Sequence, residues 1–444
     1  MANTDHTTLP LNAQWYPLKQ YAVLPAPLAR EPLDPSFYAY NPSTGALVAP
    51  LDPSKPFVAY HPDFLKLLGE EPSLEVVAAH DDYPLFHEAG IWLEETQEVV
   101  FTGNCNPSFR NLLGTLRLDG SRSVESSWDR IDPRPADGEH ESVIAINGGT
   151  LYGNQLLLCC QGTDSIPSSL SVVSPTAPHM SRPILNNFQG RPFNAINDVV
   201  VLPPFPHGTD RVDLHGDEAT TIWFTDPTYA YMQRSPGYKN HPPQLPNQVY
   251  CFTPATGEVR CVADGLAMPN GICFNHAGTV CYITDTGMIA GDGTLHPQRP
   301  ATIYAYDVVR PDPSAGADAG AGGGGEHRHW GPRLEGKRVF AYCDAGVPDG
   351  IKTDKAGNVY SGTGEGVSIW NAHGTLLGKI VLFPLSHTLP SSLPAPNKPR
   401  TRYCANFCLC PNGRVCILAE DRVYVARLDG AEVEGSLLPE RARG

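Results

Sequence analysis

Basic residues, long apolar runs and secretion signals are scarce in this 444-residue chain. Its 32 Lys and Arg against 47 Asp and Glu give a formal charge of −15. This charge argues against nucleic acid or an anionic membrane as the main partner, because both attract basic surfaces. No apolar stretch is long enough for a membrane span, and the N-terminus lacks the basic and apolar segments of a secretory signal. We therefore expect a cytoplasmic protein, a monomer or weak homodimer, whose partner is a small-molecule substrate.

Signatures of several common site chemistries are absent as well. No Gly-X-Ser-X-Gly segment predicts a serine hydrolase, and every Asn-X-Ser/Thr triplet has Pro at X, which removes the glycosylation acceptors. The 12 Cys residues are few for a disulfide framework in so long a chain, and runs such as "LLLCCQG" predict buried thiols. Cys404, Cys408, Cys410 and Cys416 could suggest zinc, but Cys408 and Cys410 alternate with apolar residues as in a buried strand.

What the chain does contain is an excess of Pro (44) and Gly (42), dispersed among short apolar runs. A unit of two short apolar strands joined by a polar turn occurs six times, and successive units start about 50 to 80 residues apart. The units span residues 91–104, 145–162, 199–227, 272–286, 351–371 and 407–428. This spacing predicts an all-β fold, a six-bladed β-propeller built of four-stranded blades. A β-sandwich with coincidental hairpins is the alternative.

The propeller is expected to occupy residues 81–444, with residues 1–80 forming an N-terminal extension that packs on the propeller or closes its ring. Residues 310–333 are rich in Gly and Ala and predict a flexible loop between two strands of one blade.

One position of the repeat carries polar side chains in several units. In a propeller, the residues just before each innermost strand meet at one rim of the central channel. Five polar residues occupy this position: Glu88, Asn197, Asn270, Asp349 and Asn406. Asp226 and Asp285, at the ends of the second strands, return to the same face. Carboxylates and amides gathered without Lys or Arg predict a divalent cation, Ca²⁺ or Mg²⁺ first and Mn²⁺ or Zn²⁺ as alternatives.

Each of these residues also has a purely structural interpretation, because Asn-Gly and Asp-Gly are common turn dipeptides. Two copies of Pro-Asn-Gly illustrate the choice. Asn412 lies between two apolar strands and is expected to turn the chain, whereas Asn270 lies before a strand whose hairpin turn comes later, at "NHAG". We interpret Asn270 as a ligand and Asn412 as a turn residue.

At these positions the chain resembles the gluconolactonase and senescence-marker-protein family of six-bladed propellers, in particular its fungal members. The resemblance rests on "HEAGIW", "NDVVV", "IWFTDPTYA", "MPNGICF", "VPDGIKTDKAGNVY" and "GVSIWNAHGTLLGKI". It implies a divalent metal held by Glu88, Asn270 and Asp349, with Asn197 close to the metal and the substrate, and it implies that Asp349 is also the catalytic general base.

Two departures from the family pattern concern the site. The usual Glu-Gly-Pro is Glu88-Ala89-Gly90 here, and Ala195 replaces an Arg that sugar-lactonase members carry two residues before the Asn, which argues against a sugar lactone as substrate. We further expect His87, Asn406 and Asp226 to line the substrate pocket.

The first hypothesis is a metal-dependent hydrolase that opens a lactone or related cyclic ester. A non-hydrolytic cyclase or isomerase of fungal natural-product biosynthesis is the alternative, and a non-catalytic scaffold is the third.

Overall fold

The fold of this chain is taken from a computed structural model, which describes residues 9–16, 51–104, 112–118, 123–124, 127–203, 220–233, 241–309, 332–383 and 403–429. Most of the loop predicted at residues 310–333 lies outside these ranges, as does Cys105. No helix in the described ranges is long and apolar enough to cross a membrane.

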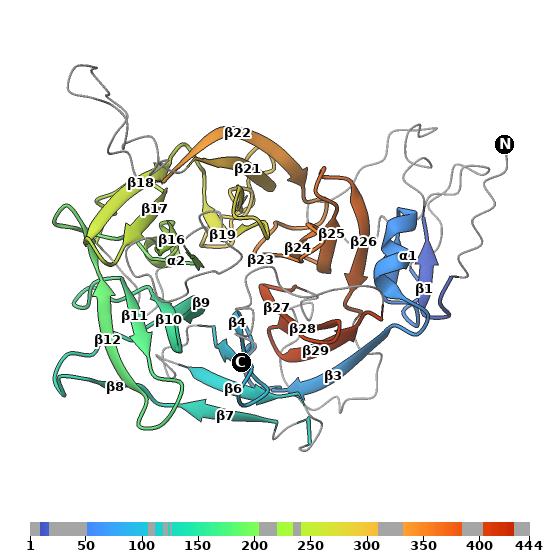
Figure 1. Cartoon of the computed structure of the whole chain (residues 1–444), viewed down its shortest axis with the longest axis horizontal. Coiled ribbons are helices and arrows are strands. Elements are labelled where there is room, and N and C mark those ends of the chain that lie inside the picture. The colour runs from blue at the N-terminus through green and yellow to red at the C-terminus, as the bar shows by residue number, and fades with distance from the viewer. Residues whose placement is uncertain are drawn as a thin grey trace, which may run out of the picture.

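Six antiparallel sheets are arranged as blades around a central axis (Figure 1). The first three blades in chain order are the following: β4 (Glu88–Leu93), β5 (Glu98–Thr102), β6 (Leu113–Arg117) and β7 (Trp128–Ile131); β9 (Ile146–Tyr152), β10 (Gln155–Cys160), β11 (Ser169–Val173) and β12 (Met180–Leu185); β15 (Val199–Leu202), β16 (Thr221–Asp226), β17 (Gln248–Thr253) and β18 (Glu258–Ala263).

The other three blades follow the same order of strands. They are β19 (Pro269–Phe274), β20 (Val280–Asp285), β21 (Thr302–Val309) and β22 (Arg333–Tyr342); β23 (Ile351–Thr353), β24 (Val359–Thr363), β25 (Gly366–Trp370) and β26 (Leu376–Val381); β27 (Asn406–Cys410), β28 (Arg414–Ala419), β29 (Arg422–Arg427) and β3 (Ser73–Ala79). The six-bladed propeller predicted from the hairpin spacing is confirmed.

The N-terminal region contributes strands to two blades. Strand β3 pairs antiparallel with β29, from Arg422 opposite Ala79 to Arg427 opposite Ser73, so the last blade combines three C-terminal strands with one from the N-terminal region. Strand β2 (Phe57–Ala59) pairs with β26, and β1 (Ala13–Trp15) pairs with β2. Smaller additions are β8 (Arg134–Pro135), which pairs with β12, and the hairpin of β13 (Asn187–Phe188) and β14 (Arg191–Pro192).

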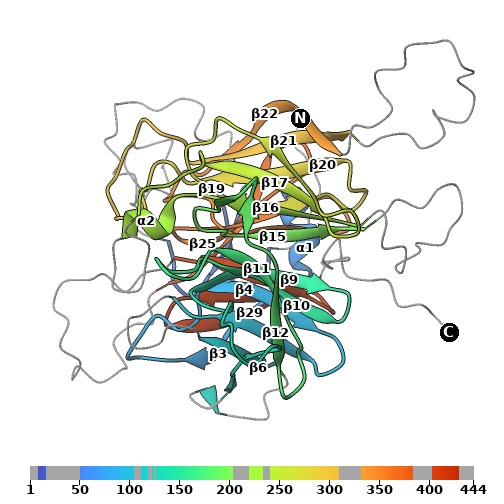
Figure 2. The same cartoon turned by 90° about the vertical axis from the view of Figure 1, so that its left-hand side faces the viewer.

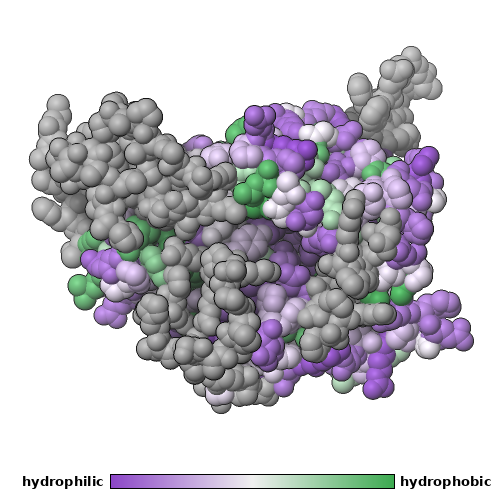
Figure 3. All heavy atoms as spheres, turned by 180° about the vertical axis from the view of Figure 1, so that it is seen from behind, coloured by the Kyte–Doolittle hydropathy of each residue, from purple (hydrophilic) through white to green (hydrophobic). Residues whose placement is uncertain are grey.

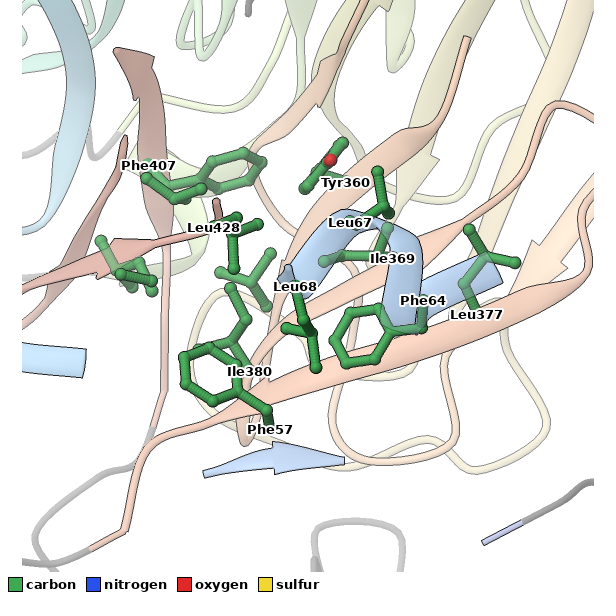
Figure 4. Packing of buried hydrophobic residues seen from close by; sticks show 14 of the residues in the cluster. Phe57, Phe64, Leu67, Leu68, Tyr360, Ile369, Leu377, Ile380, Phe407 and Leu428 are labelled. Carbon is green, nitrogen blue, oxygen red and sulfur yellow. The ribbon is translucent and has the colours of Figure 1, made fainter. Parts of the chain in front are cut away.

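The six largest apolar clusters of the described residues lie one between each pair of neighbouring blades. Both faces of a blade are therefore covered, which explains why middle strands such as β10 and β28 are almost continuous apolar runs. In the cluster between the last two blades, helix α1 (Pro62–Leu68) inserts Phe64, Leu67 and Leu68 against strands of the fifth blade (Figure 4). Gly378 lies beneath Phe64, and a Cβ there would come within 2.3 Å of the ring.

The cysteines and the second Pro-Asn-Gly behave as expected. All eleven described Cys are free and all but Cys261 are buried, which confirms the prediction of buried thiols for this part of the chain. Asn412 and Gly413 have φ values of 61° and 68°, in the left-handed region typical of hairpin turns, and with Pro411 they join β27 to β28, where Cys410 is paired with Arg414.

Helix α2 (Tyr229–Gln233) follows β16 and lies at one end of the channel axis, at the left edge of Figure 2. Figure 3 shows that face of the molecule, and the described residues near its centre are mostly hydrophilic.

Candidate metal centre

The six innermost strands start at one end of the channel, and each has a polar side chain at its start. Five of these are the residues predicted from the repeat: Glu88, Asn197, Asn270, Asp349 and Asn406, all at most 6% exposed. The sixth is Asn147 of the second blade, which is not among the predicted residues. Its sequence signal was the dipeptide Asn147-Gly148, the same pair as Asn270-Gly271. We call these six residues the rim residues.

Glycines that follow rim residues allow neighbouring blades to approach closely. A Cβ on Gly271 would come within 2.4 Å of the Asp349 carbonyl oxygen, and one on Gly148 within 2.6 Å of the Asn197 carbonyl oxygen. No side chain fits at such distances, so only Gly permits this packing. The dipeptides that are typical of turns therefore bring the rim residues of adjacent blades together.

Glu88 is held by a fixed chain of hydrogen bonds. The Asn406 Nδ2 donates to Glu88 Oε2 at 2.7 Å, while Asn406 Oδ1 accepts from Lys352 Nζ at 3.2 Å and from the Phe407 N–H at 2.9 Å. Because Lys and N–H groups only donate, the Asn406 amide has one allowed orientation. Asn406 is also fully buried and positions Glu88, and its contact with substrate stays a prediction.

Lys352 corrects the expectation that the rim has almost no cations. Lys352 lies on β23, three residues after Asp349, and its positive charge acts on Glu88 and Asp198. Asp198 is buried, and its two oxygens accept from the Val199 and Ile272 N–H groups at 2.9 and 3.1 Å. It was not predicted as a site residue, although it is part of the "NDVVV" motif.

Burial and mutual repulsion raise the pKa values of the rim carboxyls. Burial, followed by the charges of Glu88, Asp198 and Glu420, raises the pKa of Asp349 well above its usual range, although His87 opposes this shift. Burial is also the largest cause that raises the pKa of Glu88. In the protein without a cation, the site therefore disfavours full ionisation.

His87 is a cation beside these carboxyls. Its Nδ1 lies 2.7 Å from Glu420 Oε1, and its side chain is 20% exposed. Burial alone would lower the pKa of His87, but the Glu420 carboxylate outweighs burial and, with Glu88 and Asp349, raises it to about 9. His87 is thus protonated at neutral pH, at the partly exposed edge of the cluster.

The charges of this cluster do not balance. Four carboxyl groups belong to Glu88, Asp198, Asp349 and Glu420, whereas the two cations of the cluster are His87 and Lys352. Two negative charges are left over when all four carboxyls are ionised, which is the charge that a divalent cation neutralises.

Three rim oxygens also lack a hydrogen-bond partner among the residues that the structure describes. They are Asn147 Oδ1, Asn197 Oδ1 and Asp349 Oδ1, and all are buried. Buried polar atoms are almost always paired, so such a group of oxygens indicates a ligand. In the described ranges no three His, Cys, Asp or Glu side chains form a metal cluster by themselves. The candidate site instead combines carboxylates with amide oxygens, a donor set that suits hard cations.

Asp226 is hydrogen-bonded to the backbone of the segment that precedes a rim residue. Its two oxygens accept from the N–H groups of Asn194 and Ala195 at 2.9 and 2.8 Å. In the next blade, Asp285 accepts in the same way from Ala267 and Met268, both at 2.9 Å. Each Asp thus fixes the segment that leads to a rim residue, and the predicted contact of Asp226 with substrate stays a prediction.

Tyr229 on α2 is a further residue that was not predicted. Its hydroxyl accepts from Asn270 Nδ2 at 3.3 Å and is hydrogen-bonded to Thr286. Burial, and next the Asp349 charge, raise its pKa, so the hydroxyl keeps its proton. The neighbouring Ala230 packs against Ala195, the position where the family pattern has Arg.

Together, the fold and this geometry define a six-bladed propeller with an oxygen-rich polar site at one mouth of its channel. A family model described as the SMP-30/gluconolactonase/LRE-like region matches residues 206–290. The lactonohydrolase oryH of Aspergillus oryzae is 30% identical over 70% of this chain and 71% of its own length. The chain belongs to this family, as its sequence motifs predicted.

Two other proteins are similar to this chain. The lactonohydrolase oryL of Aspergillus oryzae is 27% identical over 71% of this chain, which spans 64% of the length of that relative. A solved structure of a gluconolactonase from Xanthomonas campestris matches 84% of this chain and 95% of its own chain, with a TM-score of 0.56 and 21% identity. At that identity the structural match shows the fold alone.

Proposed function

We propose that this protein is a divalent-metal-dependent hydrolase that opens a lactone, or a related cyclic ester, at the mouth of the channel. The observation that carries the proposal is the pair of unpartnered, buried oxygens of Asn197 and Asp349, next to Glu88 in a cluster where four carboxyl groups face two cations. The names of the similar lactonohydrolases support the choice of reaction.

Glu88, Asn197, Asn270 and Asp349 would hold the cation. Ca²⁺ fits this set of carboxylate and amide oxygens best, and Mg²⁺, Mn²⁺ and Zn²⁺ are alternatives. When bound, the cation supplies Lewis acidity that polarises the ester carbonyl.

The residues of the chain supply the proton transfers. Asp349 accepts a proton from the water whose oxygen attacks the carbonyl carbon. The bond between that carbon and the ring oxygen then breaks, and the proton passes to the leaving alkoxide, which yields a hydroxy acid. His87, protonated and partly exposed, offers its positive charge to the substrate or to the product carboxylate.

The substrate is proposed to be less polar than a sugar lactone. Ala195 and Ala230 are both fully buried and pack together where the family pattern would place an Arg. The test is incubation with a panel of sugar, aliphatic and aromatic lactones, followed by mass spectrometry. A product heavier by one water supports hydrolysis, whereas a product of unchanged mass supports the cyclase or isomerase alternative.

Replacing Asn270 by Ala removes a ligand oxygen and is expected to weaken Ca²⁺ binding. The loss should exceed the roughly 10- to 100-fold that is typical when a residue that supports a metal ligand is replaced. Asn412→Asp is the matched control. Asn412 only turns the chain, and Asp tolerates the same left-handed backbone. Calorimetric titration with Ca²⁺ measures the affinity of both variants. An equal loss of Ca²⁺ affinity in both would contradict the assignment of Asn270 as a ligand and Asn412 as a turn residue.

A further inference from the structure

We infer that Tyr229 is a positioning residue that fixes the orientation of the Asn270 amide, through a hydrogen-bond chain that continues to Thr286 and the Met268 carbonyl. This inference rests on the proposed metal site, because it concerns how one of its ligands presents oxygen instead of nitrogen.

The direction of the chain follows from which groups can donate. The Met268 carbonyl oxygen can only accept, and it receives the Thr286 hydroxyl at 3.3 Å as well as the Thr286 N–H at 3.0 Å. The single hydrogen of the Thr286 hydroxyl is thereby used. Either oxygen can donate in the hydrogen bond between Thr286 and Tyr229, and with the Thr286 hydrogen directed to Met268 we assign the Tyr229 hydroxyl as the donor.

The same reasoning fixes Asn270. With its hydrogen directed to Thr286, the Tyr229 oxygen can only accept from Asn270, so it faces the Nδ2 group at 3.3 Å. The reversed amide would place two acceptors against each other and lose this hydrogen bond. The Oδ1 atom, the one that can bind a cation, is therefore the atom left for the rim.

The anchor of the chain is rigid. Met268 donates its N–H to the buried carboxylate of Asp285, and Thr286 directly follows Asp285 at the end of β20. Tyr229 comes from the third blade, whereas the other members of the chain belong to the fourth. This hydrogen-bond chain thus makes the orientation of the Asn270 amide depend on the position of α2 at the channel mouth.

Glu88 is held in a comparable way, because Lys352 donates to Asn406 and Asn406 donates to Glu88. Residues behind metal ligands commonly change metal affinity by about 10- to 100-fold when they are replaced.

The test is calorimetric titration of the metal-free protein with Ca²⁺. Tyr229→Phe, which removes one oxygen and keeps the ring, is expected to raise the Kd about tenfold. Tyr250→Phe is the matched control. It also removes a single Tyr hydroxyl, one that donates to Gln248 on β17, and it should leave the Kd unchanged.

Thr286 provides an independent check should Tyr229→Phe disturb folding, which melting temperatures would reveal. Thr286→Val frees the Tyr229 hydrogen to point at Asn270 and should raise the Kd for Ca²⁺. Thr286→Ser keeps the hydroxyl and should leave the Kd close to that of the unsubstituted protein. The double variant Tyr229→Phe/Thr286→Val should lose no more affinity than the larger of the two single losses, because the residues act as one chain.

An unchanged Kd in both Tyr229→Phe and Thr286→Val, with clear Ca²⁺ binding by the unsubstituted protein, would overturn the inference and leave the metal site standing. No binding of Ca²⁺, Mg²⁺, Mn²⁺ or Zn²⁺ by the unsubstituted protein would overturn the metal site and, with it, the role of Tyr229.

Discussion

Asp349→Asn is expected to abolish metal binding and to lower kcat/KM on a cleaved lactone by about 10³-fold, while making the metal-free protein more stable. The losses follow because Asp349 is the proposed ligand and general base. The gain follows because burial and the charges of Glu88, Asp198 and Glu420 raise its pKa in the folded protein.

The sign of the stability change depends on pH. A carboxyl whose pKa is higher in the folded than in the unfolded protein stabilises the fold below its unfolded pKa of about 4, and this stabilisation is lost as the pH rises. The advantage of Asp349→Asn over the unsubstituted protein should therefore be larger at pH 8 than at pH 5.

Urea unfolding in the presence of a chelator measures this difference. Asp307→Asn is the matched control, because Asp307 is an exposed partner of Arg338 and its removal relieves no buried repulsion. A variant at position 349 that is less stable than the unsubstituted protein at pH 8, or that keeps its metal affinity, would contradict the account.

Asp226→Ala is expected to destabilise the fold by roughly 3 kcal/mol, because two buried N–H groups lose their acceptor at a cost of about 1 to 3 kcal/mol each. These are the N–H groups of Asn194 and Ala195, which lead into the rim at Asn197. Chemical denaturation measures the loss, and Asp285→Ala in the next blade should give a similar one.

The result distinguishes a structural role of Asp226, as acceptor for two backbone N–H groups, from the predicted role in substrate binding. If Asp226 bound substrate, its replacement would raise KM and leave the free energy of unfolding nearly unchanged. A stable Asp226→Ala variant with a raised KM would instead support the prediction that Asp226 binds substrate.

The architecture was predictable because each hairpin is local: two apolar strands and their turn lie within 14 to 29 residues, so the repeat is visible in the printed sequence. The pairing of β3 with β29 joins residues far apart in the chain, and no local pattern specifies such a partner. For this reason the sequence left open whether residues 1–80 close the ring or only pack on it.

The position of the candidate site was also predictable, because residues at the same phase of a repeat meet in space. The individual roles were less accessible. Asn406 and Asn270 have the same residue type and phase, yet one donates to Glu88 and the other to Tyr229. Which atom of an amide faces the rim depends on neighbours from other blades, and the sequence does not identify those neighbours.

The glycines after the rim residues show the same limit. Asn-Gly is typical of a tight turn, and Asn412-Gly413 is one. At Gly271 and Gly148 the missing side chain instead makes room for the backbone of the neighbouring blade.

The central claim is that the rim residues hold one divalent cation at the channel mouth. Titrating the metal-free protein with Ca²⁺ in a calorimeter, beside Asp349→Asn under the same conditions, tests it most directly. The account predicts one binding site per chain in the unsubstituted protein and none in the variant. Equal binding by both proteins, or no binding of any divalent cation by either, would contradict it.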